Sequence, residues 1–134
     1  MTVATIMTTN VTKISPSDGF RKAQDILDTE PFHHLLVEQD GKLVGIVSDR
    51  DLMGKIGTYI DKSPGQAYNK LRASISVADI MTTKMLVIDR DTPIDAASII
   101  LLANNISCLP IVNADYVIEG IVTWKDLLKF YLYR

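Results

Sequence analysis

The stretch GIVSDRDLM, residues 45–53, returns near the end of the chain as GIVTWKDLL, residues 120–128. Both copies keep Gly-Ile-Val, a hydroxyl residue, two variable residues and then Asp-Leu. A short apolar run is typical of a buried strand, and a hydroxyl residue followed three positions later by an acidic residue is typical of a helix start. The repeated stretch therefore predicts, twice, a strand that leads directly into a helix.

The repetition extends over most of the chain. A shift of 74 positions aligns VATIMTT (residues 3–9) with VADIMTT (residues 77–83), and one extra residue near 116–118 changes the shift to 75. Matches that run in order over a whole half indicate an internal duplication. We predict a first domain at residues 1–60, a linker with a Ser-Pro-Gly turn at 61–76, and a second domain at 77–134.

Each copy has the predicted order β-α-β-β-α. In the first copy, apolar residues at helical spacing begin at Phe20, and two strand-like runs, 34–39 and 42–48, flank Asp40-Gly41, a hairpin signal. In the second copy, Thr92 is a candidate cap and Pro93 a candidate first residue for the middle helix. The final helices are expected at 49–59 and 124–133. The fold class is therefore a mixed α/β (α+β) fold of two packed repeats.

Two helices are more apolar than a surface helix should be. The run IDAASIILLA (94–103) and the run WKDLLKFYLY (124–133) leave almost no polar face. A helix that is apolar all round must bury more than one face. Pairing of the two repeats and self-association both supply such surfaces, so we expect a homodimer or a higher oligomer.

The composition is that of an ordinary folded protein, with 47% hydrophobic and 22% charged residues. The net charge of −2 gives no electrostatic reason to expect nucleic acid or an anionic membrane as a partner. No apolar stretch reaches the roughly 18 residues of a membrane span, and the N-terminus lacks a signal-peptide pattern. The single cysteine, Cys108, favours a reducing compartment. We therefore expect a soluble, cytoplasmic protein.

Two β-α-β-β-α units that open with Ile-Met-Thr and close with Gly-Ile-Val-(Ser/Thr)-x-x-Asp-Leu resemble a tandem pair of cystathionine-β-synthase (CBS) domains, also called a Bateman module. The resemblance covers nearly the whole chain. It implies a compact pair with two clefts between the halves, in which adenosine-containing ligands such as AMP, ADP, ATP or S-adenosylmethionine bind. It also implies dimerisation through helices. No cofactor is required for such a role.

The resemblance also implies the ligand-binding residues of both clefts. Asp51 and Asp126 would hold the ribose hydroxyls, because a fixed carboxylate can accept hydrogen bonds from both. Ser48 and Thr123 would meet phosphate oxygens together with the exposed amides of the first helical turn. The remaining residues that the resemblance assigns to the first cleft are His33, His34, Ile46, Arg50, Met81 and Leu86, and those assigned to the second are Met7, Thr12, Ser107, Cys108, Ile121 and Lys125.

The basic residues differ between the two copies. His33, His34 and Arg50 gather in the first copy, whereas the second offers only Lys125. An anionic nucleotide should therefore prefer the Asp51 cleft. The second copy keeps the Leu-Pro-Ile strand at 109–111 that is common in the family, whereas the first has Leu-Leu-Val at 35–37.

Each of these residues also has a purely structural interpretation. One alternative is that Asp51, Asp126, Ser48 and Thr123 do no more than cap their helices. Other side chains of the two sets have similar alternatives: the histidines can be loop residues, the methionines can fill the core, and Cys108 can be a small buried hydrophobe.

Catalysis and metal binding are poorly supported. A nucleophile elbow and a Walker-type glycine loop are both missing from the sequence, and the duplication already explains the recurring Ser and Asp. Adjacent histidines on a strand point to opposite faces and cannot easily chelate one ion. We therefore expect a stand-alone regulatory sensor of an adenosyl ligand with an unknown protein partner. The alternative is a ligand-independent dimeric scaffold that docks an enzyme or a transporter.

Overall fold

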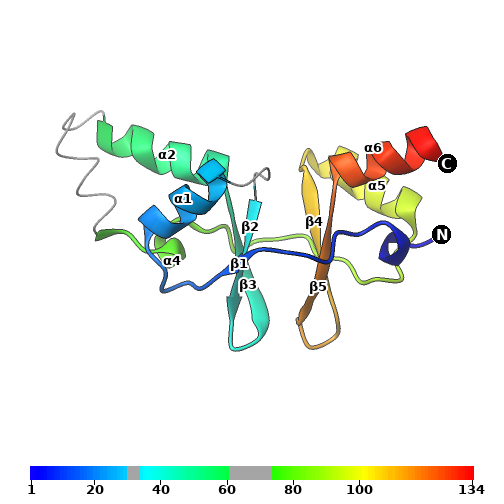
Figure 1. Ribbon diagram of the computed structural model, residues 1–134, viewed down its shortest axis with the longest axis horizontal. Coiled ribbons are helices and arrows are strands. Elements are labelled where there is room, and N and C mark those ends of the chain that lie inside the picture. Colours follow the sequence, from blue (N-terminus) through cyan, green and yellow to red (C-terminus); the bar gives the residue numbers. More distant parts are fainter. Residues whose placement is uncertain (30–33, 61–73) are drawn as a thin grey trace. The chain divides into compact units, whose positions relative to one another are not determined.

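The computed structural model describes residues 1–29, 34–60 and 74–134, and for residues 56–60 it describes the backbone only. His33 and residues 61–73 of the predicted linker lie outside this description. The described elements, coloured along the chain in Figure 1, are η1 (Val3–Thr5), β1 (Lys13–Ile14), α1 (Phe20–Thr29), β2 (His34–Gln39), β3 (Lys42–Ser48), α2 (Asp49–Ile60), α4 (Val77–Ile80), α5 (Ile94–Asn104), β4 (Cys108–Val112), β5 (Ile118–Thr123) and α6 (Trp124–Tyr133).

The first copy forms a sheet in the order β1-β2-β3. Strand β1 is parallel to β2, with Ile14 opposite Val37. Asp40 and Gly41 join β2 to β3 and both have positive φ angles, of 54° and 79°. Such angles suit the tight turn of a two-residue hairpin. The hairpin predicted at Asp40-Gly41 is confirmed.

The second copy repeats this pattern with a shorter first strand. Strands β4 and β5 are antiparallel, and Cys108 lies opposite Thr123. Ile88 forms a single parallel bridge with Ile111, the repeat equivalent of the β1–β2 pairing. The mixed α/β fold with two repeats of the predicted order is therefore confirmed. The first strand predicted for the second copy is therefore reduced to one bridging residue, Ile88.

The compact units of the structure do not coincide with the two sequence copies. One unit, here the Asp51 unit, comprises Thr12–Asp40 and Val44–Met85, and the other, the Asp126 unit, comprises Met1–Val11, Gly41–Leu43 and Leu86–Arg134. Each copy therefore gives its N-terminal segment to the unit of the other copy. We call residues 1–11 and 74–85 the exchanged segments.

Buried side chains fix the exchanged segments in their units. Ile75, Val77 and Ile80 belong to the core of the Asp51 unit, together with Phe20 of α1. Val3 is fully buried in the core of the Asp126 unit. Burying one such aliphatic side chain contributes roughly 1.5–3 kcal/mol. The backbone adds further links, such as the 2.9 Å hydrogen bond from the Val3 N–H to the Thr92 carbonyl.

The start of α5 differs from the prediction by one residue. Pro93 is the N-cap residue, with an extended ψ of 146°, and the helix begins at Ile94. Thr92 does not cap the helix, because its hydroxyl donates to Asp89 Oδ1 at 3.4 Å. The prediction of Thr92 as cap and Pro93 as first helical residue was therefore wrong.

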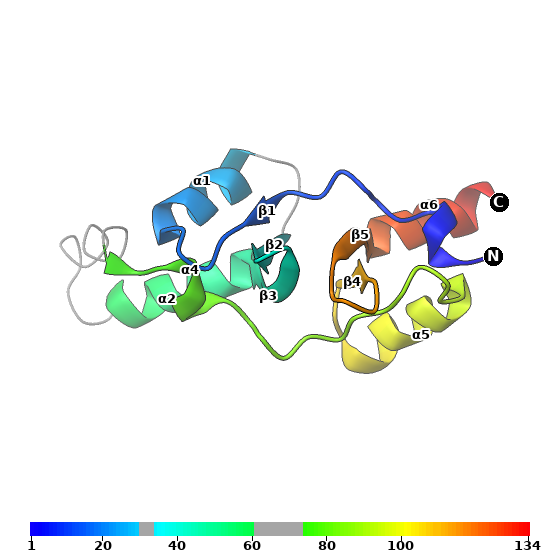
Figure 2. The ribbon, with the colours of Figure 1, turned by 90° about the horizontal axis from the view of Figure 1, so that it is seen from below.

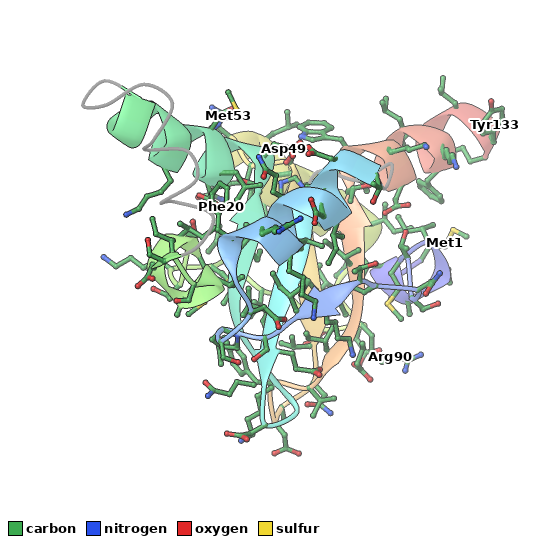
Figure 3. All side chains as sticks on the ribbon, turned by 60° about the vertical axis from the view of Figure 1, so that its left-hand side comes forward. Met1, Phe20, Asp49, Met53, Arg90 and Tyr133 are labelled. Atoms are coloured by element: carbon green, nitrogen blue, oxygen red, sulfur yellow. The ribbon has the colours of Figure 1, made fainter. Side chains whose placement is uncertain are left out.

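Helices α5 and α6 lie beside the β4–β5 hairpin within the Asp126 unit (Figure 2). Each buries part of its surface against the core and leaves large apolar side chains exposed. Tyr133 extends from the end of α6 in Figure 3 and is 83% exposed. We call the following group the apolar helix surface: Ile99, Leu102, Trp124, Leu128, Tyr131, Leu132 and Tyr133. Among the described residues, no helix is long and apolar enough to cross a membrane.

Candidate functional site

In the Asp51 unit, the turn from β3 into α2 holds the Asp51 carboxylate through the start of its own helix. Asp51 Oδ2 accepts the Ser48 backbone N–H at 2.8 Å and the Ser48 hydroxyl at 3.1 Å. In return, the Ser48 Oγ accepts the Asp51 N–H at 3.3 Å. This reciprocal pattern is a capping box, which satisfies amides that the helix itself leaves unpaired. We call residues 48–51 the first corner.

The turn from β5 into α6, residues 123–126, is the second corner and has the same geometry. Asp126 Oδ2 accepts the Thr123 N–H at 2.9 Å and the Thr123 hydroxyl at 3.1 Å, and the Asp126 N–H donates to Thr123 Oγ1 at 3.4 Å. All four residues of the two capping boxes are half-buried. The capping interpretation of the repeated motif is therefore confirmed, whether or not the carboxylates also bind a ligand.

A third capping box shows that this motif alone does not define a binding site. At the start of α4, Asp79 Oδ2 accepts the Ser76 N–H and the Ser76 hydroxyl, each at 3.0 Å. The backbone hydrogen bond from Ser76 is the main cause that lowers the pKa of the exposed Asp79 carboxyl. No hydroxyl from another segment is recorded on Asp79 within the described part of the chain.

The two corners differ from the third box because each carboxylate receives a threonine hydroxyl from an exchanged segment. Thr82 Oγ1 donates to Asp51 Oδ1 at 3.3 Å. Thr8 Oγ1 donates to Asp126 Oδ1 at 3.2 Å and lies 3.4 Å from Oδ2. Thr8 and Thr82 are repeat equivalents, and both were missed as site residues. Their place in the repeated Ile-Met-Thr stretch was the available signal.

The backbone places these threonines. Thr82 forms an antiparallel bridge with Ile46 of β3, and Thr8 forms one with Ile121 of β5. Each bridge consists of two backbone hydrogen bonds of 2.8–3.0 Å. Ile46 and Ile121 therefore lie beside the exchanged segments through their backbones, in the strands that lead into the corners.

The methionine of each exchanged segment packs on the glycine of the repeated motif. A methyl group added at Gly45 would lie 2.7 Å from Met81 Sδ, and one added at Gly120 would lie 3.0 Å from Met7 Sδ. Met81 and Met7 also pack against the apolar cores of their units. The structure thus brings each methionine into the unit that contains its assigned carboxylate, in the core-packing role that was the structural alternative.

The charged residues assigned to the corners occupy the second helical position of α2 and α6. Arg50 and Lys125 are both exposed there, and neither is ion-paired with another described residue. His34 is half-buried at the start of β2. The exposed first turns therefore carry one accessible positive charge in each unit.

In the Asp126 unit, β4 begins beside the second corner. Cys108 lies opposite Thr123, and the Ser107 carbonyl accepts the Trp124 N–H at 3.2 Å. The Cys108 thiol is buried, and desolvation raises its pKa to about 12. Cys108 is therefore the neutral, buried hydrophobe that its apolar context predicts, whereas Ser107 is exposed.

Two assigned residues fall in the other unit. Leu86 was assigned to the Asp51 site but belongs to the Asp126 unit, and Thr12 was assigned to the Asp126 site but belongs to the Asp51 unit. Both assignments stay predictions. In the described ranges, no group of three or more His, Cys, Asp or Glu side chains is arranged to hold a metal ion.

The profile of the CBS domain family matches residues 3–58 and 77–133. These two matches cover most of the chain, and the chain therefore belongs to the CBS domain family.

Similar proteins include an enzyme and CBS-pair structures. The inosine-5′-monophosphate dehydrogenase of Thermoplasma acidophilum is 32% identical over 92% of this chain, which spans only 22% of that enzyme's length. The structure of CBSX2 in complex with AMP has a TM-score of 0.83 at 29% identity, with 98% of this chain and 96% of that chain covered, and CBSX2 comes from Arabidopsis thaliana. Protein MJ1225 of Methanocaldococcus jannaschii has a TM-score of 0.88 at 22% identity, covering 97% of this chain and 47% of that one, and this similarity supports the fold alone.

Proposed function

We propose that the chain is a regulatory sensor that binds an adenosine-containing ligand, such as AMP, ADP, ATP or S-adenosylmethionine, at Asp51 and Asp126. The observation that carries this proposal is the geometry of the two corners. Each carboxylate is held on Oδ2 by its capping box, so its orientation is fixed, while Oδ1 accepts one threonine hydroxyl as its only hydrogen bond from a described residue. A carboxylate held in this way can accept hydrogen bonds from a ribose without a loss of side-chain entropy.

The surroundings of the corners suit the rest of such a ligand. Arg50 and Lys125 supply exposed positive charge in the first helical turn, where the helix dipole also favours an anion. The similarity to CBSX2, whose structure contains AMP, supports the same ligand class. We expect phosphate-bearing ligands to prefer the Asp51 corner, because His34 stands in the first copy where Cys108 stands in the second.

A sensor must also present its state to a partner. A ligand passes a signal only if the partner distinguishes the bound from the free protein. The apolar helix surface on α5 and α6 is the candidate contact, and we propose that it mediates a homodimer. Light scattering after size exclusion should then give twice the mass of the chain, and Leu128→Glu should give the monomer, whereas Lys129→Glu on the same helix should leave the dimer intact. A monomeric wild-type protein would contradict the dimer.

The same surface favours a second candidate, a scaffold that acts without a ligand. Large exposed apolar groups are typical of interaction sites irrespective of any small molecule. Acid extraction of the purified protein distinguishes the two candidates through absorbance near 260 nm from a carried-over adenosyl compound. In either case we propose a regulatory role rather than catalysis for this chain.

A thermal-shift panel with ATP, ADP, AMP, S-adenosylmethionine, NAD and GTP tests the sensor directly. A ligand at 100 times its Kd stabilises the folded state by roughly 2.7 kcal/mol, which raises Tm by several degrees in a domain of this size. The sensor predicts a rise with one or more adenosine compounds and none with GTP. The absence of a shift with every compound, in protein free of carried-over ligand, would favour the scaffold.

A further inference from the structure

The hydrogen bonds on each corner carboxylate leave room for one more donor. A carboxylate offers about four lone-pair positions on its two oxygens. On Asp51, the Ser48 N–H and hydroxyl occupy Oδ2, and the Thr82 hydroxyl occupies one position on Oδ1. On Asp126, Thr123 and Thr8 make the equivalent contacts. Among the described residues, one acceptor position on Oδ1 therefore stays open at each corner.

A vicinal diol brings two hydroxyl donors to a carboxylate that has one open acceptor position. If both diol hydroxyls are to bind, one of the donors already on the carboxylate must leave. The Ser48 N–H belongs to the backbone of the corner, and the Ser48 hydroxyl is held in the capping box because it also accepts the Asp51 N–H. The Thr82 hydroxyl makes the longest of these contacts with the Asp51 carboxylate, at 3.3 Å, and the Thr82 side chain is exposed. It is therefore the donor that leaves most easily.

From this geometry we infer that the hydroxyls of Thr82 and Thr8 compete with the ligand's vicinal diol for Asp51 Oδ1 and Asp126 Oδ1, and so lower the affinity of both sites. The inference rests on the proposed function, since it concerns the same carboxylates. The contact is not needed to orient the carboxylate, because the capping box already does so. The exchanged segment is also held by contacts that do not involve the hydroxyl, the backbone bridges of Thr82 with Ile46 and of Thr8 with Ile121.

Competition and positioning make opposite predictions for the loss of these hydroxyls. Valine keeps the branched shape of threonine and removes the donor. If the hydroxyl competes, Thr8→Val with Thr82→Val should bind AMP about 2- to 12-fold more tightly, the range of a typical hydrogen bond, because this hydroxyl–carboxylate contact is long and exposed. If the hydroxyl positions the carboxylate or contacts the ligand, the same variant should bind more weakly.

The experiment is isothermal titration of AMP and of 3′-deoxy-AMP into the full chain. Thr9→Val with Thr83→Val is the matched control, because these adjacent threonines are also repeat equivalents and neither is hydrogen-bonded to Asp126 or Asp51 in the described structure. Thr8→Ser with Thr82→Ser keeps both hydroxyls and should bind AMP as the wild type does. Circular dichroism and Tm establish that each variant is folded.

Of the three double variants, we expect only Thr8→Val/Thr82→Val to bind AMP more tightly than the wild type. The gain in affinity should be smaller for 3′-deoxy-AMP, because its single ribose hydroxyl can use the open acceptor position without displacing the threonine. Unchanged or weaker AMP binding by this variant, with normal binding by the wild type, overturns the inference and leaves the proposed function standing. A wild-type protein that binds neither nucleotide overturns both. A gain of equal size for 3′-deoxy-AMP also overturns the inference, because the diol would then play no part in it.

Discussion

Replacing Gly120 and Gly45 by alanine is a matched test of how the exchanged segments pack. Both glycines occupy the same place in the repeated motif, one in β5 and one in β3. At Gly120 the added methyl group would lie 2.8 Å from the backbone carbonyl oxygen of Thr8. At Gly45 the nearest atom is Met81 Sδ at 2.7 Å, which is the far part of a flexible side chain.

The two clashes differ in cost because only one of the neighbours can move freely. The Thr8 carbonyl accepts the Ile121 N–H at 2.9 Å, and the Thr8 N–H donates to the Ile121 carbonyl at 2.8 Å. Displacing this bridge is overpacking, which typically costs about 1–3 kcal/mol. At Gly45 only the Met81 side chain must yield, by a rotamer change that moves Sδ and Cγ and a shift of a few tenths of an ångström at Cβ, which would lie 3.2 Å from the added methyl group. Both variants gain roughly 0.4–1 kcal/mol because alanine restricts the unfolded chain, so Gly45→Ala should be nearly neutral and Gly120→Ala destabilising by about 1–2 kcal/mol.

Urea denaturation followed by circular dichroism measures both variants against the wild type. A loss of 1 kcal/mol corresponds to roughly 2–8 °C in Tm for domains of 60 to 250 residues, so thermal melts give a second readout. Equal destabilisation by the two variants would contradict the difference between a backbone and a side-chain neighbour. A Gly120→Ala protein as stable as the wild type would mean that residues 1–11 do not pack on β5.

Three further predictions concern the local structure. Thr123→Ala should destabilise the fold by about 0.5–2 kcal/mol in urea melts, because it removes the cap of α6, and an unchanged midpoint would contradict this. The Ser15 N–H is the main cause that lowers the pKa of the Asp18 carboxyl, so Asp18 stabilises the fold above its ordinary value of 3.8 and loses this effect as the pH falls through its folded pKa. The stability deficit of Asp18→Asn should accordingly be constant above about pH 5 and shrink toward pH 3, whereas a deficit that is equal at pH 7 and pH 3 would count against the Ser15 contact. Cys108, buried and with its pKa raised to about 12, should resist a disulfide reagent until urea unfolds the chain, and rapid reaction of the folded protein would show that the thiol is accessible.

Much of the fold was predictable because the sequence pattern of each helix and strand occurs twice, once in each repeat. Strands β2 and β3 and helix α6 begin and end where the sequence pattern places them, and the hairpin at Asp40-Gly41 follows from turn chemistry. The start of α5 was missed because both Thr92 and Pro93 suit a helix N-terminus, and the choice depends on whether the Thr92 hydroxyl binds the backbone of the helix or Asp89.

The site was predictable only in part, for a physical reason. A motif such as Ser-x-x-Asp gives local hydrogen bonds, and the capping boxes at Asp51 and Asp126 follow from it. The contacts of Thr82 with Asp51 and of Thr8 with Asp126 join residues 31 and 118 positions apart. No periodicity encodes such long-range contacts. The resemblance to CBS pairs assigned Met81 and Met7 to the units in which they lie, and their contact with a ligand stays a prediction.

The most direct test of the central claim is isothermal titration of AMP into the wild type, Asp51→Asn, Asp126→Asn and the double variant. Asparagine keeps the shape of the cap and removes the charge, and Asp79→Asn in the third capping box controls for loss of a capping carboxylate elsewhere. A lost charge-assisted hydrogen bond should weaken binding at each altered corner by about 10- to 150-fold. The account predicts that the double variant loses AMP binding while Asp79→Asn keeps it. A folded double variant that binds AMP as tightly as the wild type would contradict the proposed site.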